Sequence, residues 1–353
     1  MPACRGPVHS SSRGVGIEST ELTIRSDTLF SALASAVRAV AGPEGLDRLL
    51  QLALVQSPPF VVSSTFPWAG ELLFYPKPRL LPRVEEPTGQ SPMGQSPKEA
   101  AWVSAGVLSK MLGGRPVPPD KGVVDPANGV WYLRSEVAAL PGEETWWATS
   151  AVPRVTVDRQ TSASAVYRCG RAWYGPSAGL WCLVEWRDRT WEPTFDAALA
   201  FLGESGLGGE RSAGHGQFAL GERLAPALPS VPDAPLVYSL SLYHPTATEV
   251  TAGVLEAPAA YDLEMRRGWV TSPEASGVWR RAVRMLGEGA LVRRVAPTMG
   301  DLVDVTPVGP APHPVYRAGF LVGLGAVAPP EGAPAEGASA RAPAQGRRGG
   351  HRR

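Results

Sequence analysis

The chain has 353 residues, of which 44% are hydrophobic and 19% charged, and its formal net charge is +1. This is a globular composition, long enough for two domains of ordinary size. No apolar run approaches the roughly eighteen residues needed to cross a bilayer, and residues 1–16 lack the apolar core of a signal peptide. Cys4, Cys169 and Cys182 show no paired metal-ligand spacing. We therefore expect a reduced, cytoplasmic protein without structural disulfides, membrane contact, cofactor or bound metal.

Arginine is strongly preferred over lysine, with 30 arginines against four lysines. Arginine suits bidentate contacts to phosphate and stacking on bases. A GC-rich genome accounts equally well for this preference and for the abundant alanine, glycine and proline. The arginine bias alone therefore does not show that the protein binds nucleic acid. Because the net charge is near zero, a nucleic-acid-binding surface would have to gather its positive charge locally.

The first clear helix is predicted over residues 26–42, with Ser26 or Asp27 as its N-cap. Gly42 followed by Pro43 is expected to end it. Its apolar face is formed by Leu29, Phe30, Leu33, Val37 and Val40. From residue 45 to 150 the pattern does not separate helices from strands, and residues 84–98, which repeat Gly-Gln-Ser-Pro, are predicted to be a disordered insertion.

A second helix is predicted over residues 193–206, with Thr194 as its cap and Phe195, Leu199 and Leu202 on its apolar face. Strands are predicted on either side of it, over residues 179–186, 216–220, 235–243, 290–295 and 315–324. The order strand, helix, glycine-rich loop and strand is half of a ferredoxin-like unit. Two such halves per domain fit the length. We expect an α+β fold with domains at 1–150 and 151–328, followed by a disordered basic tail at 329–353.

The loop that follows this helix, GLGGERSAGHGQF (residues 206–218), spends five glycines on thirteen residues. In P-loops and dinucleotide-binding folds the glycines precede a helix, whereas here they follow one. This order excludes both kinds of nucleotide-binding loop. Backbone amides in such a loop can approach a phosphate chain closely, with Arg211 adding charge and Ser212 a hydroxyl. A flexible connection without a ligand is the alternative.

Five segments in this order resemble one family. They are RSDTLFSAL (25–33), FPWAGELLFYPKPRL (66–80), VPRVTVDRQTSASAVYR (152–168), SLYHPTATEV (241–250) and YDLEMRRGWVTS (261–272). Together with the glycine-rich loop they resemble the RAMP superfamily of CRISPR-associated proteins. Within it, they are most similar to the crRNA 5′-handle-binding subunits of type III-A (Csm) interference complexes. One departure is Arg25, because that family usually has histidine at this position.

The resemblance implies two ferredoxin-like (RRM-like) domains with a protruding β-hairpin. It also implies a non-catalytic subunit for antiviral defence that binds the repeat-derived 5′ handle of the crRNA. The expected protein partners are the large signature subunit, which carries nuclease and cyclase chemistry, and a neighbouring backbone RAMP subunit.

The resemblance further implies a set of RNA-binding residues. The loop would line the RNA backbone with Gly206, Gly208, Gly209, Arg211, Ser212, Gly214, His215 and Gly216. Arg159 and Thr161 would lie in a hairpin that wedges into the guide. Lys77, Arg79, Arg25 and Ser26 are further candidate contacts. Solvated surface charges, or a helix cap in the case of Ser26, are the alternatives for these positions.

Two other functions remain open. An endoribonuclease of the same superfamily would use a histidine as general acid or base, and the chain offers His9, His215, His244, His313 and His351. No second catalytic group stands at a suitable spacing from any of them, so we expect no catalytic residue. A protein scaffold that never touches RNA would instead make the glycine-rich loop a subunit contact.

Overall fold

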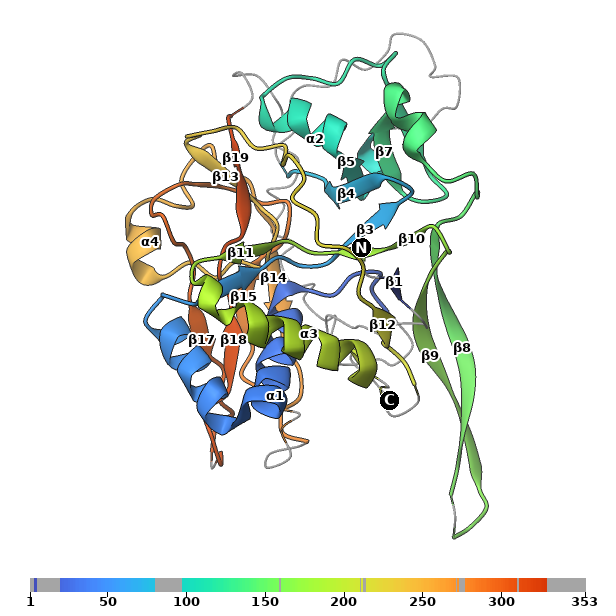
Figure 1. Ribbon diagram of the computed structural model, residues 1–353, viewed down its shortest axis with the longest axis vertical. Helices are drawn as coiled ribbons and strands as arrows, with labels where there is room; N and C mark the ends of the chain where they lie inside the picture. The colour runs from blue at the N-terminus through green and yellow to red at the C-terminus, as the bar shows by residue number, and fades with distance from the viewer. Residues whose placement is uncertain are drawn as a thin grey trace, which may run out of the picture.

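The computed structural model describes residues 3–4, 20–79, 97–158, 160–209, 211, 214–270, 272, 277–309 and 311–328. Within them the chain has a mixed α/β fold (Figure 1). Most of the predicted insertion at 84–98, the predicted tail at 329–353, Arg159 and Ser212 lie outside the described residues.

Helix α1 (Ser26–Leu54) is longer than the sequence predicts. Gly42 has a φ of 74° and leaves helical geometry, so the backbone breaks where the Gly-Pro pair predicts an end. The helix then resumes, because proline is well suited to the first turn of a new helical segment. The predicted caps are wrong: the N-cap position is Arg25, whose side chain makes no capping bond.

The region from residue 60 to 133, which the sequence pattern leaves undecided, forms most of a six-stranded sheet with order β10-β3-β4-β5-β7-β6. Its parallel pair β5 and β7 is connected through α2 (Ala105–Leu112). Its strands are β3 (Phe66–Ala69), β4 (Leu72–Pro76), β5 (Trp102–Ser104), β6 (Gly122–Asp125), β7 (Val130–Leu133) and β10 (Ala178–Trp181). Beside this sheet, β2 (Phe60–Val62) pairs with β11 (Val184–Trp186). The predicted strand at 179–186 is therefore two strands in different sheets.

Helix α3 (Glu192–Ser205) confirms the second predicted helix, but it starts earlier and Trp191, not Thr194, is its N-cap residue. The strands expected after it are present and short, except that the one predicted over 315–324 is two strands in different sheets, Tyr316–Ala318 and Gly323–Ala326. They and the remaining elements are β1 (Ala3–Cys4), β12 (Phe218–Ala219), β13 (Leu236–Ser239), α4 (Ala247–Thr251), β14 (Leu263–Arg266), β15 (Val283–Leu286), β16 (Leu291–Arg293), β17 (Leu302–Asp304), β18 (Tyr316–Ala318) and β19 (Gly323–Ala326). The three-stranded sheet has the order β16-β13-β19, while β14 pairs with β15 and β17 with β18. Short 3₁₀ turns occur at Pro97–Glu99, Arg134–Ala139 and Arg189–Trp191.

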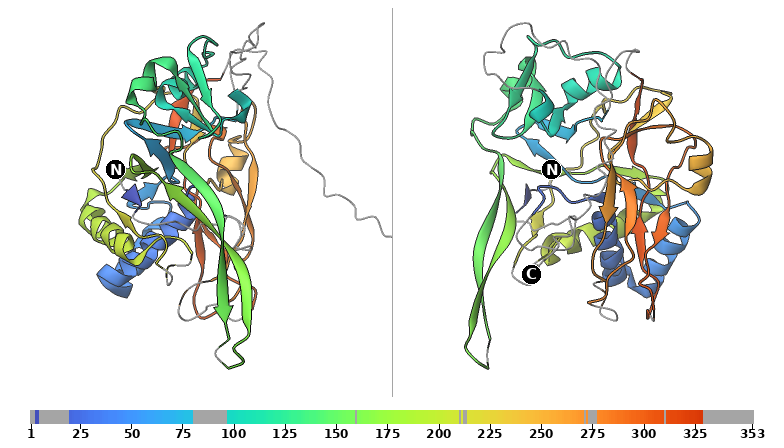
Figure 2. Two further views of the ribbon diagram at one scale, coloured as in Figure 1. Left: turned by 90° about the vertical axis from the view of Figure 1, so that its right-hand side faces the viewer. Right: turned by 180° about the vertical axis from the view of Figure 1, so that it is seen from behind.

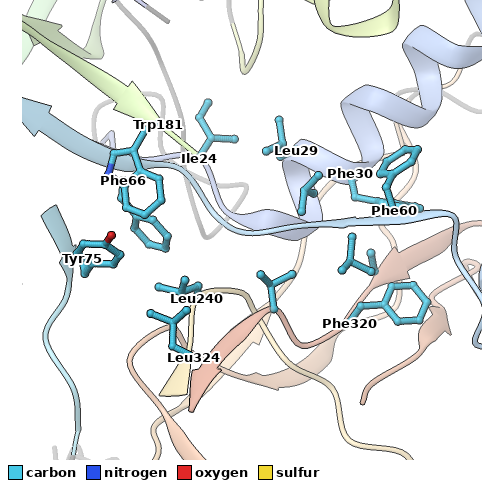
Figure 3. Close-up of a cluster of buried hydrophobic side chains, with 14 of the residues drawn as sticks. Ile24, Leu29, Phe30, Phe60, Phe66, Tyr75, Trp181, Leu240, Phe320 and Leu324 are labelled. Carbon is cyan, nitrogen blue, oxygen red and sulfur yellow. The ribbon is translucent and has the colours of Figure 1, made fainter. Parts of the chain in front are cut away.

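One large hydrophobic core is shared by the two halves of the chain. Phe30 of α1 and Phe66 of β3 lie in it together with Leu240, Phe320 and Leu324 from the C-terminal half (Figure 3). The strand β10 also pairs with β3 across the predicted boundary at residue 150. Burying apolar surface from both halves in one core couples their stabilities.

A long hairpin projects from this body (Figures 1 and 2). Its strands, β8 (Trp147–Val157) and β9 (Ser164–Tyr174), pair antiparallel along their whole length. The hairpin predicted around residues 152–168 is present and extends further toward the body on both strands.

A buried ion cluster joins α1 to the C-terminal strands. The Asp27 carboxylate accepts hydrogen bonds from Arg266 Nε and Nη2 at 3.0 Å each, and from Arg317 Nη1. All three side chains are buried, with Asp27 only 2% exposed. Burial by itself raises the pKa of this carboxyl, but the two guanidiniums outweigh it and lower the pKa from 3.8 to about 2. Asp27 is therefore an interior counter-ion rather than a helix cap.

Replacing Asp27 with asparagine is expected to lower the free energy of unfolding by about 3–5 kcal/mol, because two buried guanidiniums lose their counter-charge. The folded-state pKa is depressed, so the carboxylate stabilises the fold above its ordinary pKa of 3.8 and loses this effect as the pH falls toward 2. Urea unfolding at neutral and acidic pH measures both effects. Asp47→Asn, at an exposed position of the same helix, is the matched control. Equal stability of the two variants would contradict this role.

Candidate functional site

The glycine-rich loop closes on itself through a narrow neck. Gly206, with a φ of 86°, follows α3, and the Leu207 amide donates to the Gly216 carbonyl at 2.9 Å. A Cβ atom on Gly216 would lie 2.0 Å from the Leu207 carbonyl oxygen, and one on Gly206 would lie 2.7 Å from that of His215. These two glycines are thus required by the close approach of two backbone segments.

The tip of the loop is different, because its glycines are open to solvent. Gly209, Arg211 and Gly214 are exposed, and Gly208 is partly exposed. A Cβ atom on Gly214 would meet nothing within 4 Å, although its φ of 79° still favours glycine. The loop therefore presents bare backbone and one arginine to solvent, held by a packed neck.

His215 links this loop to the projecting hairpin. Its ring is 3% exposed, and Nε2 lies 2.9 Å from Nη2 of Arg154, which is on β8. A guanidinium only donates hydrogen bonds, so Nε2 is the acceptor in this contact. His215 therefore positions the loop against the hairpin, which leaves it little surface for an RNA contact of its own.

The sequence analysis missed Arg154 because it lies far from the loop in the chain and has no motif of its own. It also missed Arg168, which is exposed on β9, and Arg171, which is half-buried nearer the hairpin base. Their close spacing, with only Cys169 and Gly170 between them, is the signal in the sequence that could have singled out these two. Together with Arg154 they place three positive charges between the middle of the hairpin and its base.

The Asp-Arg-x-Thr motif forms the hairpin turn. Asp158 Oδ1 accepts from the amides of Gln160 and Thr161 at 2.7 and 3.2 Å. These backbone hydrogen bonds lower the pKa of the Asp158 carboxyl. The Thr161 hydroxyl accepts from the Ala163 amide at 3.3 Å, and its side chain is exposed. Turn formation thus accounts for Asp158 and Thr161, and exposure leaves Thr161 accessible to a ligand.

Lys77 and Arg79 lie away from the loop and already have partners. Lys77 Nζ donates to the Lys98 carbonyl at 2.8 Å. Arg79 Nη1 lies 3.0 Å from Oδ2 of Asp262, in a pair that is roughly half exposed. An exposed pair of this kind contributes little to stability, so a phosphate can compete for the arginine.

Arg25 and Ser26 do not fit a role as RNA contacts. Arg25 is paired with Glu21 and Glu264 at 3.1 Å each and with Glu288. The buried Ser26 hydroxyl accepts from the Leu242 amide at 2.9 Å. Both are used to hold α1 against the C-terminal half. The sequence could not show this because every partner except Glu21 is more than 200 residues away.

Across the described ranges, no three His, Cys, Asp or Glu side chains come together as a metal site would need. No helix in the same ranges is long and apolar enough to cross a membrane.

Solved structures with this fold include the Csm3-Csm4 subcomplex of the type III-A CRISPR-Cas interference complex. One chain of it aligns with a TM-score of 0.61 and 14% identity, covering 92% of this chain and 98% of that one. A Csm1-Csm4 cassette in complex with pppApA aligns with a TM-score of 0.57 and 19% identity, covering 92% and 95%. At these identities the likeness establishes the fold.

Sequence comparison is more specific. A family profile described as the CRISPR Csm4 C-terminal domain matches residues 232–325. The CRISPR system Cms protein Csm4 of Mycobacterium tuberculosis is 28% identical over 305 residues, which is 85% of this chain and 89% of that protein. The protein of the same name from Thermococcus onnurineus is 27% identical over 194 residues, or 55% of this chain and 61% of the relative. Residues 232–325 thus match the Csm4 C-terminal domain, and most of the chain is similar to Csm4 proteins of type III CRISPR systems. This similarity confirms the resemblance seen in the motifs.

Gly216→Ala is expected to open the neck of the loop, because its methyl group would overlap the Leu207 carbonyl. We expect a local cost of about 1–3 kcal/mol and trypsin cleavage after Arg211 that is about tenfold faster. Gly214→Ala is the control, since it has a similar φ and open space around it. Equal cleavage rates in the two variants would show that the neck does not hold the loop.

Proposed function

We propose that this chain is the non-catalytic subunit of a type III-A Csm complex that binds and caps the repeat-derived 5′ handle of the crRNA. The observation that supports this most directly is the contact between Arg154 and His215. It combines the glycine-rich loop and the projecting hairpin into one surface, although the two residues are 61 positions apart in the sequence. Neither element alone would make a site.

The chemistry of this surface suits single-stranded RNA. The exposed tip at Gly209 and Gly214 leaves room for a sugar–phosphate chain to approach the peptide backbone. Main-chain and guanidinium donors at Arg211 and Arg168 would contact phosphate and ribose oxygens. Such contacts hold the strand without reading its bases.

The hairpin extends this surface outward. Val155, Val157 and Val166 are 57%, 61% and 72% exposed near its end. Val155 and Val166 are direct cross-strand partners, so they present one apolar ridge. An apolar ridge on a stiff two-stranded arm can insert between bases at the edge of the handle. Arg159 and Thr161 in the turn would then lie close to the guide.

The proposed protein partners are the large signature subunit and a neighbouring backbone RAMP subunit. The solved relatives named above are Csm1-Csm4 and Csm3-Csm4 assemblies, which supports both. We also propose that two ferredoxin-like domains, at 1–150 and 151–328, form the framework of the subunit. Its proposed location is the cytoplasm, and its proposed role is antiviral defence.

Replacing both Arg211 and Arg168 with glutamate is expected to reduce the crRNA content of the assembled complex about tenfold. Two phosphate contacts are lost, so the slope of log K against log salt should fall in magnitude by about 1–2. The matched control is Arg115→Glu with Lys121→Glu, two exposed positions in a different part of the fold. Normal crRNA content in the Arg211/Arg168 variant would refute the RNA-binding role of this surface.

The competing enzymatic function makes a different prediction. In the structure, His215 is engaged by Arg154, and His244 Nδ1 lies 2.9 Å from Oδ1 of Asp301. Incubating the subunit with repeat RNA should produce no sequence-specific cut. A specific cleavage that Arg115→Glu with Lys121→Glu leaves intact and His215→Ala abolishes would instead support an endoribonuclease.

A further inference from the structure

A second surface lies on the two-stranded ribbon that contains β14 and β15. Burial alternates along its first strand: Leu263, Met265 and Trp269 are 58%, 41% and 41% exposed, whereas Arg266 and Val270 are buried at 3% each. Period-two alternation places the first three on one face of the ribbon and the other two on the opposite face. The inner face covers the core, and the outer face is bare.

Two tryptophans form the centre of the outer face. Trp269 and Trp279 are antiparallel bridge partners, flanked by bonds from the Val270 amide to the Val278 carbonyl and from the Arg280 amide to the Gly268 carbonyl. This pattern defines a non-hydrogen-bonded pair, in which side chains lie closest. The two rings have centroids 4.0 Å apart, and Trp279 is 40% exposed.

On the part of this face that the structure describes, the charged side chains contributed by the ribbon are arginines. Arg267, Arg281 and Arg284 are exposed beside the tryptophans, and Arg281 is paired with Asp304 at 3.2 Å. Neither Arg267 nor Arg284 has an ion-pair partner among the described residues. Protein–protein interfaces are richer in tryptophan, methionine and arginine than the rest of a protein surface, and poorer in carboxylates. The described part of this face has that composition. Trp and Arg are also the residues that most often carry its binding energy.

The tip of the ribbon is held in place by its neighbour. Ser272 Oγ lies 2.7 Å from Nε2 of His313, which belongs to the loop between β17 and β18. The Arg281–Asp304 pair joins the same two hairpins. A surface fixed in this way loses little conformational freedom when it binds.

The ribbon also lies on a different side of the molecule from the glycine-rich loop. In Figure 1 α3, which leads into that loop, is in front of β14 and β15. In the view from behind in Figure 2 the ribbon is in front and α3 is behind it. A ligand on the ribbon face is therefore separated from the proposed handle-binding surface by the body of the protein.

We propose that the outer face of the ribbon, formed by Leu263, Met265, Arg267, Trp269, Trp279 and Arg284, docks a protein subunit of the complex through an acidic and apolar surface. This rests on the proposed function, because it presupposes assembly with other subunits. RNA fits the face less well. The indoles already pack against each other at a centroid distance of 4.0 Å, and exposed Leu263 and Met265 offer nothing to a phosphate chain.

Oxidation of Met265 by hydrogen peroxide tests the proposal in the wild-type protein. Met265 is 41% exposed, whereas Met285 and Met299 are 0% and 3% exposed and serve as internal controls. We expect sulfoxide formation at Met265 to be about tenfold slower in the assembled complex than in the free subunit, with protection that survives nuclease treatment. Protection that nuclease removes would assign the face to RNA, and absence of protection would show that nothing docks there. Either result overturns the proposal.

A charge-reversal variant identifies the subunit. Arg267→Glu with Arg284→Glu should lower capture of the nuclease-treated large subunit or of the backbone subunit about tenfold, because repulsion replaces attraction to carboxylates. The Arg115→Glu with Lys121→Glu variant should capture both normally. Because RNA is absent, this result is independent of the handle-binding test. Unchanged capture of both subunits by the Arg267/Arg284 variant refutes the docking face.

Discussion

The fold depends on one buried carboxylate. Asp27, at the start of α1, is hydrogen-bonded to Arg266 at the end of β14 and to Arg317 in β18. Ions leave water at a cost of several kcal/mol each, which only close pairing can offset. The arrangement therefore holds the N-terminal helix and the C-terminal strands in a single geometry. Arg25 adds ion pairs to Glu264 and Glu288. The two halves of the chain are therefore joined by one buried ion cluster and by one apolar core.

The body that this ion cluster holds together supports two surfaces, the glycine-rich loop with the hairpin and the outer face of the ribbon. On one side, α3 carries the glycine-rich loop, and Arg154 fixes the projecting hairpin against it through His215. On the other side, the ribbon rests its buried face, including Arg266, on the core and exposes its tryptophans. A subunit that must hold RNA and also contact other proteins needs separate surfaces for each, and a rigid core that keeps their relative positions constant.

Sequence reasoning recovered what local chemistry determines. The loop, the hairpin turn at Asp158, α3 and the family itself follow from short motifs, because turns and caps depend on neighbouring residues. It failed where distant partners decide. Ser26 and Asp27 have the residue types of helix caps, yet their partners are Leu242, Arg266 and Arg317. Gly42 breaks the helix as predicted, but packing of the next turns against the core lets it continue. The Arg154–His215 contact had no sequence signal at all.

The glycines of the loop are required for two different reasons. Gly206 and Gly216 are required by contacts within the loop, whereas the tip remains open for a ligand. The most direct measurement is a cryo-EM structure of the assembled complex with its crRNA. The account predicts that main-chain amides at the loop tip and the Arg211 guanidinium lie within hydrogen-bond distance of the handle backbone, with the hairpin alongside. A map in which residues 208–214 face solvent, or another protein, and the handle lies elsewhere would contradict it.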